Sequence, residues 1–191
     1  MTRYTNGICV EGIMDQFSYR LNGVTIRNAR KSDVSSIAEL KSKLDRIHRL
    51  PGLWPPEGGS SQYVLRYRKM LRQPIARVFV AERSPNGIIG YLTAFIQTRK
   101  CNERDFKRIG VIGEAFVEER HRNRGIGTAL VQTASSFFSG KGVRHLTLRN
   151  AVGNETANRF WSNLAFNPVL YTRTTTLRDL NRALRKTMES S

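Results

Sequence analysis

The chain has 191 residues, 39% of them apolar and 25% charged, which is the composition of a globular domain that buries its own core. No apolar run is long enough to cross a bilayer and the first residues lack the apolar centre of a signal peptide, so we expect a cytoplasmic protein with no membrane partner. The two cysteines, Cys9 and Cys101, are far apart and the three histidines follow no metal-ligand spacing, which argues against a disulfide framework and a zinc site.

The formal net charge of +17 admits two interpretations. A basic surface can serve solubility alone, or it can serve an anionic macromolecular partner such as RNA or the ribosome. The sequence contains no known nucleic-acid-binding motif, and it leaves both interpretations open.

The first elements follow an extension of 22 residues that has some strand character near its end. Residues 24–29 are predicted to form a strand. Ser32 or Asp33 caps the helix that follows. Its apolar residues recur at helical spacing and are Val34, Ile37, Leu40, Leu44 and Ile47.

Residues 51–61 are predicted to form a loop rich in proline and glycine that contains Trp54. Ser60 or Ser61 begins a second helix. Its apolar stripe consists of Tyr63, Val64, Tyr67, Met70 and Leu71. Its polar face is basic and consists of Arg66, Arg68, Lys69 and Arg72.

Two strands, residues 77–82 and 90–98, are predicted to be joined by a Pro-Asn-Gly turn. Residues 99–108 are predicted to form a charged loop. Residues 111–117 are apolar apart from Glu114, which is typical of a buried strand.

Elements alternate along the rest of the chain. A helix is predicted from Thr128 to the glycines near residue 140, followed by a strand over residues 143–149. A helix over residues 154–164 and a final strand over residues 169–177 come next, and the C-terminal residues are basic. This alternation of strands and helices indicates the α/β class.

The turn after the 111–117 strand contains Gly125-x-Gly127 at the start of a helix. The first backbone N–H groups of a helix lack helical partners and face the positive end of its dipole, so this turn is suited to a phosphate. A tight turn alone is the simpler explanation of two glycines. A Walker loop would need a lysine here, and a dinucleotide fingerprint would need glycine in place of Leu130.

The segment Arg122-x-x-Gly125-x-Gly127 resembles the pyrophosphate loop, Arg/Gln-x-x-Gly-x-Gly/Ala, of the GNAT superfamily of acetyl-CoA-dependent N-acetyltransferases. Residues 154–166, Asn-Glu-Thr-Ala-Asn-Arg-Phe-Trp-Ser-Asn-Leu-Ala-Phe, are similar to the family's Asn-x-x-Ala-x-x-Phe/Leu-Tyr-x-x-Leu-Gly-Phe. Residues 26–29, followed by Asp33 and a helix, resemble the family's opening.

The resemblance implies a GNAT domain over residues 23–178, with an extension at residues 1–22 and a basic tail at residues 179–191. The implied fold is a mixed, mostly antiparallel sheet, splayed at the cofactor strand and flanked by helices. The implied reaction is direct transfer of the acetyl group of acetyl-CoA to an amine, without a metal. A bulge at Gly113 would open the splay.

The resemblance also assigns cofactor-binding residues. Backbone groups of Phe116 and Val117 would pair with the pantetheine arm and polarise the thioester carbonyl. Asn154 matches a position that bonds the same arm. The pyrophosphate would be held by Arg122, Asn123, Arg124, Gly125, Ile126, Gly127 and Thr128.

Glu114 is the candidate catalytic base. Residues 112–117 resemble Ile-Glu-Asp-Leu-Phe-Val of GNAT members that act on cationic amines, with Glu114 at the second acid and Gly113 in place of the first. A carboxylate inside an apolar strand needs water or a partner. The alternative role is therefore a structural ion pair with a nearby arginine.

Trp161 stands where many family members have a tyrosine whose hydroxyl is proposed to protonate the departing thiolate. An indole N–H is a donor but not an acid near neutral pH. We therefore place Trp161 and the loop residue Trp54 at the substrate site, with Tyr171 as a weak candidate for the acid.

The leading hypothesis is an N-acetyltransferase whose acceptor is a small-molecule amine or a protein amine. The alternative is a non-catalytic module of the same fold that binds coenzyme A or docks on RNA or the ribosome. The oligomeric state is left open, with a homodimer among the alternatives.

Overall fold

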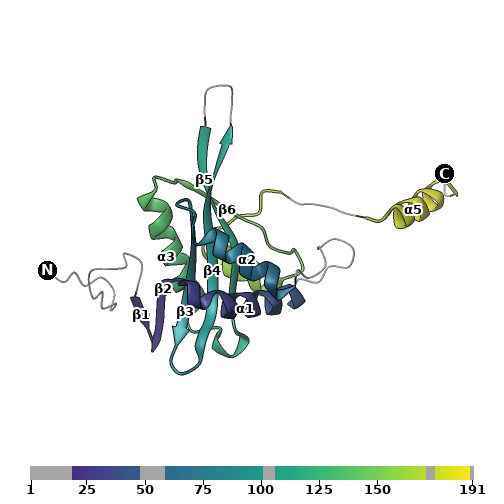
Figure 1. Cartoon of the computed structure of the whole chain (residues 1–191). Helices are drawn as coiled ribbons and strands as arrows, with labels where there is room; N and C mark the ends of the chain where they lie inside the picture. Colours follow the sequence, from purple (N-terminus) through teal and green to yellow (C-terminus); the bar gives the residue numbers. More distant parts are fainter. Residues whose placement is uncertain (1–18, 48–58, 101–105, 171–174, 190–191) are drawn as a thin grey trace.

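The computed structural model describes residues 19–47, 59–100, 106–170 and 175–189. Their strands form one six-stranded sheet in the order β1-β2-β3-β4-β5-β6, in which β5 and β6 are parallel and the other neighbours antiparallel (Figure 1). The strands are β1 (Tyr19–Leu21), β2 (Val24–Asn28), β3 (Ala76–Arg83), β4 (Gly87–Lys100), β5 (Phe106–Val117) and β6 (His145–Leu148).

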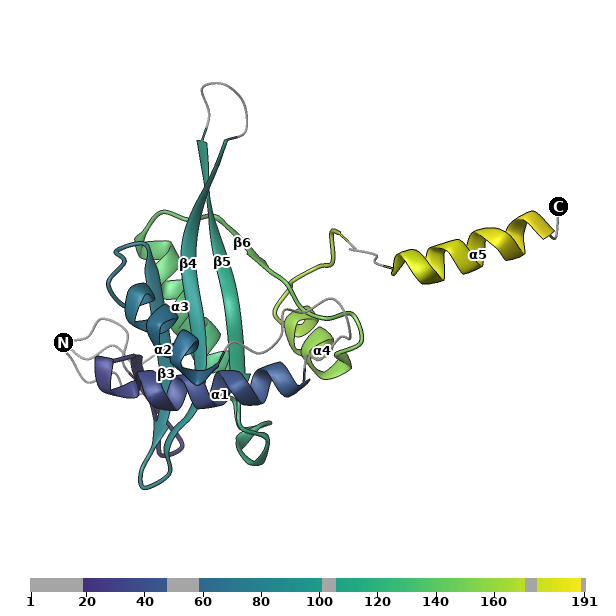
Figure 2. The same ribbon diagram turned by 45° about the vertical axis from the view of Figure 1, so that its right-hand side comes forward.

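Helices cover both faces of this sheet, which confirms the expected α/β architecture (Figure 2). They are α1 (Val34–Ile47), α2 (Ser60–Met70), α3 (Ile126–Gly140), α4 (Glu155–Asn163) and α5 (Leu177–Glu189), with 3-10 turns η1 (Lys31–Asp33) and η2 (Glu119–His121). The helices α1 and α2 pack on one face and α3 on the other, whereas α5 lies apart from the sheet. None of the described helices combines the length and hydropathy that a membrane crossing requires.

Strand alternation divides the core into two layers, as β3 illustrates. Val78 and Val80 belong to the cluster under α1 and α2, whereas Phe79 and Ala81 belong to the cluster under α3. Successive side chains of a strand point to opposite faces, so one continuous apolar run supplies both layers. The predicted strand over residues 77–82 therefore lies at the centre of the sheet.

The start of α1 is fixed to β2 by a buried ion pair. The Arg27 guanidinium donates to both Asp33 carboxylate oxygens, at 2.7 and 3.0 Å, and to Glu82 at 2.8 Å. The Asp33 carboxylate also accepts the backbone N–H of Arg30 at 2.6 Å. Burial opposes ionisation of Asp33, but the bonds from Arg27 and Arg30 outweigh it and lower the pKa of this carboxyl group.

The sheet is splayed next to the expected cofactor strand. β6 pairs with β5 only from Ile109 opposite His145 to Ile112 opposite Leu148. From Glu114 to its end at Val117, β5 stays paired with β4 and runs free of β6. This opening is the splay that the family resemblance implied.

The loop predicted over residues 99–108 is wrong at both ends. β4 continues to Lys100 and β5 begins at Phe106, with Arg99 opposite Lys107. Charged residues conceal the alternation of a strand whose two faces are both exposed to solvent. Only residues 101–105 are left of the predicted loop, and they lie outside the described residues.

The final strand predicted over residues 169–177 is also wrong where the structure describes it. Val169 and Leu170 are 92% and 84% exposed and pair with no strand, and Leu177 is the first residue of α5. β-branched residues favour strands only where a neighbouring strand and a packed face are available.

Candidate active site

A β-bulge in β5 lies at the opening of the sheet. Thr93 of β4 lies opposite Glu114, and the next pair is Ala94 with Ile112, so Gly113 has no cross-strand partner. The bulge expected at Gly113 is therefore confirmed. A bulge re-aims the side chain beside it, and here that residue is Glu114.

Glycine is required at the bulge because the Thr93 side chain occupies the space of a Cβ. A Cβ on Gly113 would lie 2.8 Å from Thr93 Oγ1 and 3.1 Å from the ring of Phe95. The fully buried Thr93 hydroxyl accepts the backbone N–H of Glu114 at 2.9 Å. This crowding accounts physically for a glycine at position 113.

The Glu114 carboxylate points toward α1 and α2, and its side chain is 10% exposed. Its Oε2 atom accepts the Tyr67 hydroxyl at 2.6 Å and the Tyr91 hydroxyl at 3.3 Å. Its Oε1 atom lies 3.1 Å from the guanidinium of Arg66 and 3.9 Å from the ammonium of Lys41. The ion pair with an arginine, which the sequence offered as an alternative role, is thus present.

A second buried carboxylate lies behind this group. Asp45 accepts hydrogen bonds from the Lys41 ammonium and, at 2.5 Å, from the Tyr63 hydroxyl. Lys41 also lies 5.2 Å from the centre of the Tyr63 ring. Sequence reasoning missed Lys41 and Asp45. The available signal was their spacing of four residues beside Leu40 and Leu44 on the apolar stripe of α1.

The two tyrosines that bind Glu114 act as fixed donors. Burial, followed by the negative charge of Glu114, raises the pKa of Tyr67 and of Tyr91 well above the ordinary value of 10.0. Both phenols therefore stay protonated at physiological pH. They hold the Glu114 carboxylate in place and are poor proton donors to a leaving group.

Arg122 fixes the loop that follows β5. Its Nε donates to the Val117 carbonyl at 3.0 Å, and its guanidinium lies 5.7 Å from the centre of the Phe116 ring. Phe116 is buried under α1 and α2. The arginine therefore closes η2 back onto the end of β5.

The start of α3 has the conformation of an anion-binding turn. Gly125 is its N-cap with φ of 77°, a left-handed conformation that favours glycine, and no side chain caps the helix. Asn123 is also left-handed, with φ of 58°. The first recorded helical bond runs from Ala129 N–H to the Gly125 carbonyl. The preceding amides of the first turn remain available for a ligand.

Gly127 has a different reason to be glycine. A Cβ there would lie 3.2 Å from the Phe160 ring of α4. The residue thus permits close packing between two helices. Of the other predicted loop residues, Ile126 is buried, whereas Arg124 and Thr128 are exposed to solvent.

The residues predicted on α4 have structural contacts. Asn154 caps this helix by accepting the Ala157 N–H at 3.1 Å. Trp161 is 8% exposed and packs edge-on against Phe160 and Phe166, with ring centres 4.8 and 5.4 Å away. Trp54 and Tyr171 lie outside the described residues.

His121 is buried in η2 without a hydrogen-bond partner for either ring nitrogen among the described residues. Burial, followed by repulsion from Arg120, lowers its pKa below 6.5. The imidazole is therefore neutral at physiological pH and packs as an apolar ring beneath the loop.

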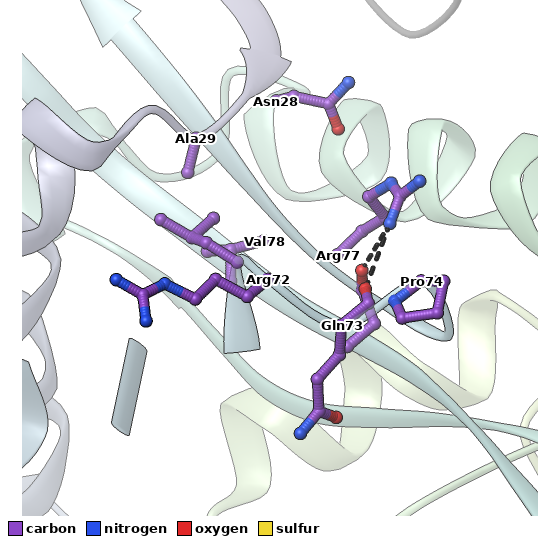
Figure 3. Close-up of a pocket in the computed structure, with 9 residues that line it drawn as sticks. Asn28, Ala29, Arg72, Gln73, Pro74, Arg77 and Val78 are labelled. Atoms are coloured by element: carbon purple, nitrogen blue, oxygen red, sulfur yellow. Dashed lines mark hydrogen bonds between the residues drawn. The ribbon is translucent and has the colours of Figure 1, made fainter. Parts of the chain in front are cut away.

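Two hollows lie at opposite ends of the sheet. One, of about 500 Å³, lies between the end of α1 and η2 and is bordered by Lys43, Phe116 and Arg122. The other, of about 370 Å³, lies between the end of β2 and the start of β3 (Figure 3). The second contains none of the predicted site residues. No group of three metal-ligating side chains occurs within the described residues.

Comparisons with known proteins show what the chain is similar to. An uncharacterized N-acetyltransferase of Methanocaldococcus jannaschii is 26% identical over 166 residues. The match covers 83% of this chain and 66% of that protein, so the chain spans just under two thirds of the relative.

Solved structures share the fold. A mutant of the BH1408 protein from Bacillus halodurans has a TM-score of 0.71 at 18% identity, over 80% of this chain and 98% of that one. The aminoglycoside 6'-N-acetyltransferase AAC(6')-Ih from Acinetobacter baumannii has a TM-score of 0.63 at 20% identity, over 81% and 99%. AAC(6')-Iy, in complex with a bisubstrate analog of coenzyme A and acetylneamine, has a TM-score of 0.62 at 19% identity, over 80% and 99%.

The model of the acetyltransferase (GNAT) family matches residues 44–166, which is more than half of the chain. The matched segment includes the bulged strand, the Gly125 turn and α4. The chain therefore belongs to the GNAT family of acetyltransferases.

Proposed function

We propose that this protein transfers the acetyl group of acetyl-CoA to an amine, which attacks the thioester directly in a ternary complex. One observation carries the proposal: the bulge at Gly113 aims the Glu114 carboxylate at the face of α1 and α2, beside the stretch of β5 that β6 leaves open. A held carboxylate next to an open strand edge supplies both a base and a place for an acyl donor.

The donor would lie along the open edge of β5 and across the start of α3. The residues fit this ligand, because left-handed Gly125 leaves the first turn of α3 uncapped and Arg122 closes the loop onto Val117. Backbone groups of Phe116 and Val117 would face the pantetheine arm. Arg124 and the amides of residues 126–128 would meet the pyrophosphate. Asn154, at the start of α4, would contact the pantetheine arm.

Glu114 would take a proton from the acceptor ammonium, and the free amine would then form a C–N bond while the thioester C–S bond breaks. The nitrogen would release its remaining excess proton to water as the neutral amide forms. Arg66 would first have to leave the carboxylate. Its side chain is 50% exposed whereas that of Glu114 is 10% exposed, so the arginine can move into solvent. Tyr67 and Tyr91 would keep the carboxylate oriented. Because their raised pKa makes both phenols weak acids, we assign the thiolate no protein acid and propose that it leaves as the anion.

The test is release of coenzyme A from acetyl-CoA in the presence of a panel of amines that includes aminoglycosides, since AAC(6')-Ih and AAC(6')-Iy are aminoglycoside acetyltransferases. Glu114→Gln should lower turnover while the melting temperature still rises with acetyl-CoA. Binding of acetyl-CoA without turnover on any amine would favour the non-catalytic alternative.

A further inference from the structure

Part of the protein's positive charge lies on α2 and at the end of the sheet away from Val117. Residues 66–81, 94–100, 106–113 and 131–149 hold twelve Lys or Arg residues (five, two, two and three) and neither Asp nor Glu. Like charges gathered in this way repel one another, which costs stability unless an anion meets them. The part of this surface around the β4–β5 ribbon is called the basic end. Its residues are Arg77, Arg99, Lys107, Arg108, Lys141 and Arg144.

Recorded contacts connect the residues of the basic end on the α3 side. The Arg77 guanidinium lies 5.3 Å from the centre of the Phe137 ring, one turn before Lys141 at the end of α3. Arg108 donates to the Lys141 carbonyl at 3.3 Å. Arg144 directly precedes His145, which pairs with Ile109. These contacts place Arg77, Arg108, Lys141 and Arg144 on neighbouring parts of β3, β5, α3 and β6.

Beyond its pairing with β3 and β6, the β4–β5 ribbon projects from the sheet (Figures 1 and 2). Arg99 lies opposite Lys107 on one of its faces, and Arg108 lies on the other face. Both faces of the ribbon are therefore basic. The connecting residues 101–105, which include Glu103 and Asp105, lie outside the described residues.

A row of basic residues, Arg72, Lys69 and Arg66, leads along α2 from this end to Glu114 and is called the α2 track. Arg72 and Arg77 both border the second hollow. Arg77 donates to the Gln73 and Ala76 carbonyls, and the Arg72 side chain points away from Arg77 (Figure 3). Lys69 and Arg66 continue along the exposed side of α2 at helical spacing, about 4.5 Å of rise apart. Arg66 ends the track on the Glu114 carboxylate.

We propose, on the basis of the acetyltransferase function above, that the basic end and the α2 track bind the phosphate backbone of an RNA that carries the acceptor amine. A phosphate beside Arg66 would draw this guanidinium from Glu114 and free the base as the acceptor arrives. RNA is favoured over DNA because its 3' end can carry an amino acid as an ester, which supplies an aliphatic amine. Within the described part of the basic end and of α2, the exposed large apolar side chains are Leu65 and Ile75, which are too few to favour a lipid bilayer.

Binding is tested with an uncharged RNA hairpin that has a single-stranded 3' tail, by fluorescence anisotropy as a function of salt. The double variant Arg108→Glu/Lys141→Glu should bind about ten-fold more weakly, with a salt slope smaller by roughly 1.4–1.8, because two phosphate contacts are lost. The control Arg20→Glu/Arg159→Glu makes the same change in net charge away from the track and should bind within about two-fold of wild type. Equal weakening by both pairs would mean that net charge alone attracts RNA, and would overturn the proposal.

Catalysis is tested with the same hairpin carrying an alanyl ester at its 3' end, compared with the alanyl ester of adenosine. We expect kcat/KM to be at least ten-fold higher for the hairpin, and this advantage to disappear in Arg108→Glu/Lys141→Glu without a change for the small ester. Equal kcat/KM for the two substrates would refute the inference. Turnover of other amines but of neither ester would refute it and leave the proposed function intact. Turnover of no amine would mean that the proposed function itself had failed.

Discussion

The bond between Thr93 and the Glu114 amide should be a measurable determinant of the bulge. Thr93→Val keeps the shape of a fully buried side chain and removes the hydroxyl that accepts the Glu114 N–H at 2.9 Å. A buried amide without a partner costs about 1–3 kcal/mol, and the methyl group that replaces the hydroxyl returns at most about 0.8 kcal/mol. We therefore expect a loss of roughly 1–2 kcal/mol, or a fall in Tm of roughly 2–8 °C for a chain of this size.

The measurement is urea unfolding, with Thr133→Val as the matched control. Thr133 is also buried, and its hydroxyl donates to the Ala129 carbonyl at 2.9 Å. That carbonyl already accepts a backbone N–H within α3, so removal of the Thr133 hydroxyl leaves no buried group without a partner. The control should stay within about 0.5 kcal/mol of wild type.

Both threonine variants should be assayed with the best acceptor found. Thr93→Val should lower kcat more than Thr133→Val does, because only Thr93 fixes the backbone that carries Glu114. If Thr93→Val is as stable as Thr133→Val, then this hydrogen bond does not determine the bulge, and the account of Gly113 and Glu114 given above fails.

Four further perturbations address the site and its frame. Glu114→Gln should lower kcat by about 10²–10⁴-fold with acetyl-CoA affinity nearly unchanged, and full activity across the pH range would remove Glu114 from the mechanism. Gly125→Glu should abolish the rise in Tm with acetyl-CoA, since it forces a left-handed side chain and a negative charge into the turn; an unchanged shift would place the pyrophosphate elsewhere. Asp33→Asn should destabilise the fold at neutral pH, and the difference should shrink as pH falls below the ordinary pKa of 3.8 and vanish below the lowered pKa of the folded state; urea titrations at several pH values measure this. His121→Phe should flatten the loss of stability as pH drops below 6.5, because the unfolded imidazole takes up a proton that the buried one resists; an unchanged pH slope would refute this.

The strand–turn–helix unit around Gly125 could be predicted from the sequence because its determinants are local. The apolar run of β5, the helical spacing of α3 and the two glycines lie within about thirty consecutive residues. Short-range sterics and hydrogen bonding largely decide such units. The bulge at Gly113 was expected from the family resemblance, and the pairing of β4 with β5 confirms it.

The charged ribbon and the C-terminal segment could not be predicted correctly. Arg99 and Lys107 lie in paired strands although their surroundings are polar, and Leu177 begins a helix after residues with strand propensity. Pairing with a neighbour decides whether such a segment becomes a strand, and that neighbour is remote in the chain.

The surroundings of Glu114 were decided only by the tertiary structure. Its partners come from α1, α2 and β4, between 23 and 73 residues earlier in the chain, and no spacing relates them. Gly127 likewise faces Phe160 of α4, whereas the sequence alone had predicted that Gly127 faces a bound phosphate. The sequence by itself determined which residue types each element presents, because helix and strand periodicity act within a few residues. Packing between elements decided which of those side chains meet, because that depends on how distant apolar faces are buried together.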